Sequence, residues 1–222
     1  MKSEPKPSGA ALRLSAEGLA CQRGGRIVFE ELDFSVSGGE ALVVTGPNGT
    51  GKSSLLRQIA GLVEIAGGRI RLDGGDAELT LPEQAHYVGH LDALKPAMSV
   101  RETAQFWSEF LWSASSGGSG DIDEALEQLD LGPLSALPVA YLSAGQRRRL
   151  SLTRLLLAPR PLWLLDEPSV ALDHASILRL TALMEAHVGS GGIIVAATHQ
   201  DLGLAQARFL DLGRFARRGV PA

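Results

Sequence analysis

The chain has 222 residues, a formal net charge of −4 at pH 7 and one cysteine, Cys21. This length predicts one large domain with room for an inserted lobe. The charge excludes a general attraction to nucleic acid or anionic lipid, and one cysteine excludes an internal disulfide and suits a reducing compartment. No apolar run approaches the roughly 18–20 residues that a membrane-spanning helix needs.

The beginning of the chain predicts a flexible tail followed by strands. Residues 1–10 are polar, contain two prolines and lack the apolar core of a signal peptide. Further on, apolar residues alternate with polar ones, which is the pattern of half-buried strands. The alternating apolar residues are Leu12, Leu14, Leu32, Phe34 and Val36. We expect residues 19–26 to lie between these strands and Gly38-Gly39 to turn the chain into the next one.

The next segment has the pattern of a phosphate-binding loop. Residues 41–45 are apolar and typical of a strand buried on both faces. The following eight residues fit G-x-x-x-x-G-K-[ST] at every position. They are Gly46, Pro47, Asn48, Gly49, Thr50, Gly51, Lys52 and Ser53, and we include Ser54 among the nucleotide-binding residues. Apolar residues with helical spacing follow, from Leu55 to Val63.

A strand, such a loop and a helix direct several backbone N–H groups and a helix N-terminus at one point. That point suits the β- and γ-phosphates of a nucleotide. Lys52 is predicted to reach those phosphates, and the hydroxyl of Ser53 is predicted to ligate Mg²⁺. The chain is therefore expected to bind a nucleoside triphosphate.

A hairpin, a short strand and a helix are predicted after the loop. Gly67-Gly68, the alternating Ile70 and Leu72, and residues 73–75 indicate a second hairpin. A short strand over 85–88 leads to Gly89-His90. Ser99 and Glu102 then form a capping-box pattern, which opens a helix rich in aromatic residues. Those aromatic and apolar residues are Phe106, Trp107, Phe110, Leu111 and Trp112.

The aromatic residues of this helix have two interpretations. They form the core of a small helical lobe, or one face of them docks a partner helix. Residues 115–120 are rich in serine and glycine and predict a flexible link. Asp121 and Glu124 then predict the start of another short amphipathic helix, which ends near residues 131–133.

Another helix start lies at Ser143, which stands in capping-box relation to Gln146. The helix is predicted to continue to Pro159. The arginines at 147–149 are expected to lie mostly along a solvated helix face. A serine cap followed by the small residues Ala144 and Gly145 can also bind an anion at the helix N-terminus.

Acidic residues and a histidine follow the two remaining apolar strands. Residues 162–165 predict a buried strand that ends in Asp166 and Glu167, and residues 193–198 predict another that ends in His199. The carboxyl edge of a parallel sheet is where α/β folds bind ligands. Asp166 is predicted to hold Mg²⁺, and Glu167 to orient or deprotonate an attacking water. A lone histidine is usually structural, but His199 in this position is predicted to contact the γ-phosphate.

These motifs, in this order and approximate spacing, resemble those of the ATP-binding-cassette (ABC) ATPases over nearly the whole chain. They are the phosphate loop and residues 142–146, 166–168, 171–173 and 198–199. The resemblance implies an α/β P-loop fold with an N-terminal antiparallel β part and an inserted helical lobe at about 91–158, within a single domain over 11–222. It also implies that ATP is sandwiched between two copies of the chain.

In that sandwich, the motif Ser143-Ala144-Gly145-Gln146 of one copy faces the γ-phosphate held by Lys52 of the other. Asp173 crosses the interface between the copies. ATP and Mg²⁺ are the cofactors that the resemblance implies.

A narrower resemblance connects the chain with the ATPase subunits of the haem exporters used in cytochrome c maturation. It rests on residues 21–29 and 87–95, on Ala144 and on the early end after His199. Two positions depart from the wider family: Arg23 stands where an aromatic ring normally stacks on adenine, and His90 stands where glutamine is usual. Both departures match the haem-exporter ATPases, so Arg23 is assigned to nucleotide binding and His90 to the catalytic group.

The narrower resemblance implies integral-membrane transporter subunits as partners, at the cytoplasmic face of a bacterial inner membrane. It also implies haem delivery to a periplasmic chaperone. Two alternatives remain open. A transporter of another substrate shares the same ATPase motifs, because the membrane subunits choose the substrate. A soluble cassette acting on ribosomes or DNA tends to have two cassettes, a long coiled coil or basic stretches, and the sequence has none of these; no nucleic-acid partner is expected.

Overall fold

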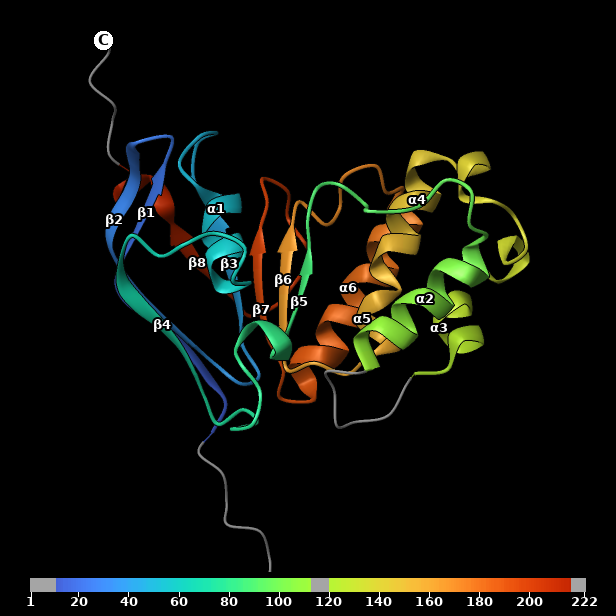
Figure 1. The fold of residues 1–222 in the computed structure, drawn as a ribbon, viewed down its shortest axis with the longest axis horizontal. Helices are drawn as coiled ribbons and strands as arrows, with labels where there is room; N and C mark the ends of the chain where they lie inside the picture. Colours follow the sequence, from blue (N-terminus) through green and yellow to red (C-terminus); the bar gives the residue numbers. More distant parts are fainter. Residues whose placement is uncertain (1–10, 113–119, 217–222) are drawn as a thin grey trace, which may run out of the picture.

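Two β-sheets and a group of helices lie side by side in the computed structural model (Figure 1). The model describes residues 11–112 and 120–216. The expected tail at 1–10 and nearly all of the expected link at 115–120 lie outside these described residues. The parallel sheet occupies the middle, with the antiparallel sheet on one side and helices α2 to α5 on the other.

The antiparallel sheet has the strand order β2-β1-β4. Its strands are β1 (Arg13–Arg23), β2 (Arg26–Ser37) and β4 (Gly67–Asp73). The expected connection at residues 19–26 was wrong, because the strands continue to a two-residue turn at Gly24-Gly25. Both glycines have positive φ, 54° and 77°, which a tight hairpin turn requires. The second predicted hairpin was also wrong: β4 pairs antiparallel with β1, a strand distant in sequence.

The central sheet is parallel and has the order β5-β6-β7-β3-β8. Its strands are β5 (Ala85–Val88), β6 (Leu162–Asp166), β7 (Ile193–Ala197), β3 (Ala41–Thr45) and β8 (Ala207–Asp211). The first four had been predicted within a residue of these bounds. β8 was not predicted, because this edge strand has no continuous buried run and its Phe209 is 72% exposed.

The helices differ from the predicted ones mainly at their ends. They are α1 (Lys52–Ile59), α2 (Val100–Trp112), α3 (Ile122–Gln128), α4 (Ala144–Leu152), α5 (Arg154–Leu157) and α6 (His174–Gly189). Single 3₁₀ turns span Pro82–Gln84, Gly132–Leu134, Val139–Tyr141 and Leu212–Arg214. α1 ends before Leu62, which is exposed, and α3 ends before the expected residues 131–133. The helix predicted to reach Pro159 is interrupted at Thr153, whose hydroxyl donates to the carbonyl of Leu150.

The parallel strands are buried on both faces, and alternate residues enter two separate cores. Trp163 and Leu165 of β6 face a core that also contains α6 and the helical group α2 to α5. Leu162 and Leu164 face the other core, which contains α1 and the antiparallel sheet. The predicted α/β fold, with an antiparallel β part and a helical lobe, is thereby confirmed.

The aromatic residues of α2 lie on two faces of the helix, one packed into the helical lobe and one exposed. Leu111 is buried, and Trp107 lies under the guanidinium of Arg154 at 4.2 Å from ring centre to Cζ. Phe106 and Phe110 stack on each other at 5.8 Å and are exposed. Docking of a partner on these two rings stays a prediction. Within residues 11–112 and 120–216, no helix has the length and apolar character needed to span a membrane.

Candidate nucleotide-binding site

Four neighbouring strands of the parallel sheet deliver the candidate residues to one edge. β5, β6, β7 and β3 run in the same direction, so their carboxyl ends lie together. A cavity of about 500 Å³ opens at this edge, within the size range of small-molecule sites. It is lined by Arg23, Val28, Asn48, Gly49, Gly51, Lys52, Ser53, Ser54, His90, Asp166 and Glu167.

The phosphate loop owes its shape to glycine at Gly51. This residue caps α1 with a φ of 99°, a backbone conformation that residues other than glycine rarely adopt. A Cβ atom here would lie 2.6 Å from Cγ1 of Val28 and 2.9 Å from the ring of Phe29. The glycine therefore lets the loop pack closely on β2. The loop is tightened further by Thr50, whose hydroxyl donates to the carbonyl of Pro47 at 2.9 Å.

Lys52 is 8% exposed and directs its ammonium group back into the loop. It donates to the carbonyl of Gly46 at 2.7 Å and to that of Pro47 at 3.3 Å. Its third neighbour is Nε2 of His199, at 3.0 Å. Nε2 of His199 also lies 3.1 Å from the side-chain oxygen of Asn48. The structure thus brings together the predicted phosphate ligand, the loop and the histidine after β7.

Ser53 and Asp166 provide the oxygen atoms expected of a magnesium site. The hydroxyl of Ser53 donates to Oδ1 of Asp166 at 2.9 Å, and Asp166 is 2% exposed. Mg²⁺ prefers hard oxygen ligands and completes its shell with water and phosphate oxygens. One hydroxyl and one buried carboxylate side by side fit that preference. Tyr87 donates to Oδ2 of Asp166 at 3.4 Å, and its own hydroxyl accepts from Nε of Arg57 at 3.1 Å.

Glu167 has an unusual backbone conformation, with φ 48°. Its N–H donates to the carbonyl of Ala197 on β7 at 2.8 Å, and its own carbonyl accepts from Arg148 at 2.8 Å. The carboxylate accepts from the hydroxyl of Thr198 at 3.1 Å and lies 4.0 Å from Nε2 of His199. Glu167 is therefore held beside the carboxyl end of β7, where it lines the cavity.

The two positions that depart from the wider family both line the cavity. Arg23 is the last residue of β1, is exposed and shares this wall with the apolar Val28. His90 follows β5 directly after Gly89 and lies on the same cavity as Glu167. The proximity of Arg23 and His90 to a nucleotide stays a prediction.

The second motif lies apart from this cavity in the same chain. Ser143 caps α4 and forms the predicted capping box with Gln146. Gly145 packs so closely on the following segment that a Cβ atom would lie 2.8 Å from the carbonyl of Ala171. Asp173 caps α6, and its pKa is lowered by hydrogen bonds from Ser176. None of Ser143, Ala144, Gly145, Gln146 and Asp173 lines the described cavity.

Four contact residues were missed or misjudged from the sequence: Arg57, Tyr87, Arg148 and Thr198. Tyr87 and Thr198 occur inside recognised motifs, which was the available signal. Arg148 was expected on a solvated helix face, and that expectation was wrong for this residue, which is 3% exposed. The run of three arginines does not show that Arg148 is buried, because burial depends on what packs against the helix.

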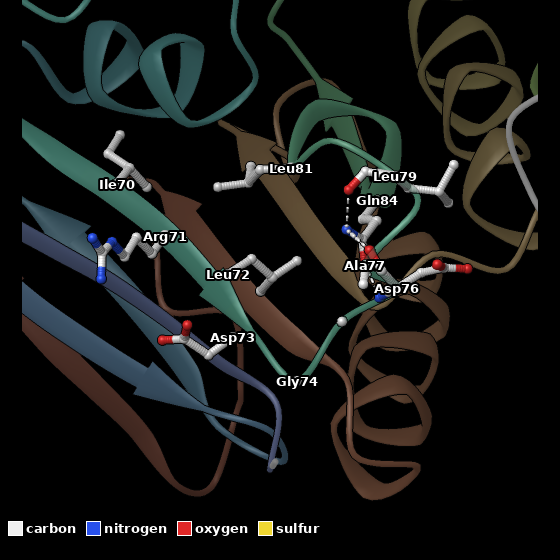
Figure 2. Close-up of a pocket in the computed structure, with 11 residues that line it drawn as sticks. Ile70, Arg71, Leu72, Asp73, Gly74, Asp76, Ala77, Leu79, Leu81 and Gln84 are labelled. Carbon is white, nitrogen blue, oxygen red and sulfur yellow. Dashed lines mark hydrogen bonds between the residues drawn. The ribbon is translucent and has the colours of Figure 1, made fainter. Parts of the chain in front are cut away.

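Another cavity of about 500 Å³ lies near the amino end of β5, at the opposite sheet edge (Figure 2). Its walls include Ile70, Leu72 and Leu81. The buried amide of Gln84 holds the segment 76–79, which also contributes to the lining. Nε2 of Gln84 donates to the carbonyls of Asp76 and Leu79, each at 3.0 Å. These contacts satisfy the N–H groups of the amide within the protein, and Arg71 is the one basic residue among the described residues that line this cavity.

Comparison with known proteins agrees with this geometry. A family model described as ABC transporter matches residues 29–170. The chain therefore belongs to the ABC transporter family. A solved ATP-binding subunit of an ABC transporter superposes with a TM-score of 0.75 at 22% identity, covering 90% of this chain and 86% of that one. This likeness confirms the fold.

Sequence similarity narrows the group. The chain is 56% identical over 202 residues to the cytochrome c biogenesis ATP-binding export protein CcmA of Nitrobacter winogradskyi, covering 91% of this chain and 98% of the relative. It is 55% identical over 205 residues to the protein of the same name from Bradyrhizobium diazoefficiens, covering 92% and 100%. Within the ABC transporter family, the chain belongs with these CcmA export proteins.

Proposed function

We propose that the chain is the ATP-hydrolysing subunit of a haem exporter that serves the biogenesis of c-type cytochromes. ATP hydrolysis is proposed because four candidate residues line one cavity: Lys52, Ser53, Asp166 and Glu167. The haem part is supported by identity above 50% with export proteins of cytochrome c biogenesis over nearly the whole chain. The predicted transporter for another substrate is the second candidate.

Each group at the cavity has a proposed role. Loop N–H groups and Lys52 hold the β- and γ-phosphates, and Ser53 and Asp166 hold Mg²⁺, which neutralises phosphate charge when bound. Glu167 takes the proton of the attacking water, because it is the carboxylate on the cavity lining that is not paired with Ser53. His199 and His90 contact the γ-phosphate or that water.

The separation of the second motif from the cavity supports action between two copies. The N-terminus of α4, with Ser143 as its cap, is exposed, so its free N–H groups can face phosphate held by a second copy. Asp173, the cap of α6, is also exposed and is proposed to cross the interface between the copies. ATP binding thus closes the pair, and hydrolysis opens it.

The proposed partners follow from the transporter family. Integral-membrane subunits would receive the closing motion, with the chain bound peripherally at the cytoplasmic face of a bacterial inner membrane. A haem chaperone on the other side would act indirectly. The exposed pair Phe106 and Phe110 on α2 is a candidate contact for such a subunit.

The test is complementation in a bacterium that lacks its own copy of this subunit. The native chain, Lys52→Ala and a control, Arg69→Ala, are expressed at matched levels. Arg69 is exposed on β4, forms an ion pair with Glu17 and does not line the cavity, so its loss leaves the cavity intact. Haem staining should detect c-type cytochromes with the native and Arg69→Ala chains and not with Lys52→Ala, while b-type cytochromes stay unchanged. Normal c-type cytochromes in cells without the subunit would overturn the haem assignment.

A further inference from the structure

The guanidinium of Arg148 on α4 is buried, and every one of its donors is used. A guanidinium has five N–H groups. Here Nε donates to the carbonyl of Pro168 at 3.2 Å. Nη1 donates to the carbonyl of Gly89 at 2.6 Å and to Oδ1 of Asp92 at 3.3 Å. Nη2 donates to the carbonyl of Asp166 at 3.0 Å and to that of Glu167 at 2.8 Å.

Four of these five acceptors are backbone carbonyls at the catalytic edge of the sheet. Three belong to the consecutive residues 166–168, at the carboxyl end of β6, and the fourth belongs to Gly89, directly before His90. Parallel pairing between β5 and β6 stops at Val88 and Leu165. Arg148 therefore connects strands β5 and β6 at the point where their pairing ends, and it connects both strands to α4.

The contact at Glu167 bears directly on the direction of its side chain. A non-glycine residue with φ 48° is in the sparsely populated left-handed region and persists only when its surroundings hold it. Its N–H is fixed by Ala197, and its carbonyl is fixed by Arg148. Loss of the second contact would free the backbone on the carbonyl side and let the carboxylate leave the position beside Thr198.

The two neighbouring arginines have other contacts. Arg147 donates to the carbonyl of Leu142. Arg149 donates to the carbonyls of Leu129 and Asp130, each at 2.8 Å, and pairs with the carboxylate of Asp130. Arg149 thus tethers α4 to the helical lobe and does not reach the strand ends, which makes it a matched control.

We propose that Arg148 is a positioning residue for ATP hydrolysis. It fixes the backbone of Glu167 and the segment that carries His90 relative to α4, whose N-terminus carries Ser143. This inference rests on the proposed role of Glu167 as the base. Lysine cannot replace this arginine, because an ammonium has three donors at one point and lacks the planar fork. Glutamine offers two N–H groups.

The effect is expected on turnover and not on nucleotide affinity. None of the five acceptors is a phosphate ligand, so Arg148→Lys and Arg148→Gln should bind ATP within about two-fold of the native affinity. Misplacement of a reacting group by about 1 Å can lower a rate by about 100-fold. We expect kcat to fall at least about ten-fold in both variants, with KM for ATP nearly unchanged.

The experiment uses the subunit in complex with its membrane partners, purified from membranes. Turnover, KM, ATP affinity and melting temperature are measured for the native chain, Arg148→Lys, Arg148→Gln and Arg149→Gln. Arg149→Gln should keep native turnover. If ATP affinity falls as much as kcat, or if Arg148→Lys retains native kcat, Arg148 has no positioning role.

A further comparison separates this inference from the proposed function. Glu167→Gln and the double variant Glu167→Gln/Arg148→Gln are assayed for residual single-turnover hydrolysis. Because Arg148 acts through Glu167, the second substitution should lower the residual rate by less than two-fold. A further fall equal to that of Arg148→Gln alone would overturn the inference. Native turnover in Glu167→Gln would instead overturn the proposed base.

Discussion

Nζ of Lys52 lies 3.0 Å from Nε2 of His199, although 147 residues separate them in the chain. The same Nε2 atom lies 3.1 Å from the side-chain oxygen of Asn48, so the imidazole contacts both Lys52 and the loop before it. The pair links the start of α1 to the segment after β7. A phosphate that draws Lys52 from the loop carbonyls therefore meets His199 at the same point.

The first prediction concerns this pair. Lys52→Ala removes a charged hydrogen-bond donor, which contributes about 1.5–3 kcal/mol, so ATP affinity should fall by about ten-fold to a hundred-fold. His199→Ala leaves the ammonium of Lys52 in place and should lower turnover more than affinity. Calorimetric ATP titration and steady-state turnover distinguish the two. Equal losses of affinity in both variants would mean that His199 is only a binding residue.

The second prediction concerns Glu167. Glu167→Gln should keep ATP and Mg²⁺ but lose turnover by at least about 100-fold, because only the water-activating carboxylate is removed. It should accumulate as an ATP-bound dimer. Glu185→Gln, a change at an exposed position of α6, is the matched control. Hydrolysis by Glu167→Gln at the native rate would assign the base elsewhere.

The third prediction follows from the position of Ser143 outside the cavity. Ser143→Arg should bind ATP as a monomer with native affinity and fail to dimerise, since its bulk and charge occupy the exposed N-terminus of α4. Size-exclusion chromatography with ATP, in the Glu167→Gln background, measures the dimer directly. A normal ATP-dependent dimer of Ser143→Arg would contradict the sandwich between copies.

The fourth prediction concerns adenine. Arg23 offers a guanidinium plane where a ring is usual, so discrimination between ATP and GTP should be weak. Arg23→Tyr restores stacking, which adds about 0.5–1.5 kcal/mol, so ATP affinity should rise by about two-fold to ten-fold. Arg26→Tyr is the control, because Arg26 pairs with Arg23 across the hairpin but does not line the cavity. An equal response of both variants in calorimetry would show that position 23 does not face the base.

The fifth prediction concerns acid stability. Burial lowers the pKa of His86 from 6.5 to about 3 and that of His187 from 6.5 to about 4. As the pH is lowered, the unfolded chain therefore binds protons at these residues at a higher pH than the folded protein does. The free energy of unfolding begins to fall below pH 6.5 and continues to fall until the pH reaches the folded pKa values. The free energy of unfolding should decrease by up to about 1.4 kcal/mol per pH unit for each histidine.

Urea unfolding at pH 7.5, 6 and 5 measures this decrease above the main titration range of carboxylates. His86→Asn keeps a donor for the carbonyl of Ala158, which Nε2 of His86 approaches at 2.7 Å. The variant should show about half of the native slope between pH 6.5 and 5. An unchanged slope would mean that His86 does not remain neutral in the folded protein.

The sequence by itself determined the elements whose signals are local. The strand at 41–45, the phosphate loop and the start of α1 follow from an apolar run, glycine spacing and a helical period. The capping boxes at Ser99 and Ser143 formed as predicted, because each involves residues three positions apart. The strand ends at Asp166 and His199 were likewise visible, since strands buried on both faces are continuous apolar runs.

Only the tertiary structure decided which elements meet. β4 pairs with β1, and β8 joins the sheet through β3, because pairing partners are chosen by packing and not by neighbouring sequence. α4 presents Arg148 to the strand ends and Arg149 to the helical lobe, although both belong to one run of charge. A run of charge gives each residue the same local pattern, whereas burial and hydrogen-bond acceptors come from segments 18 to 59 residues away.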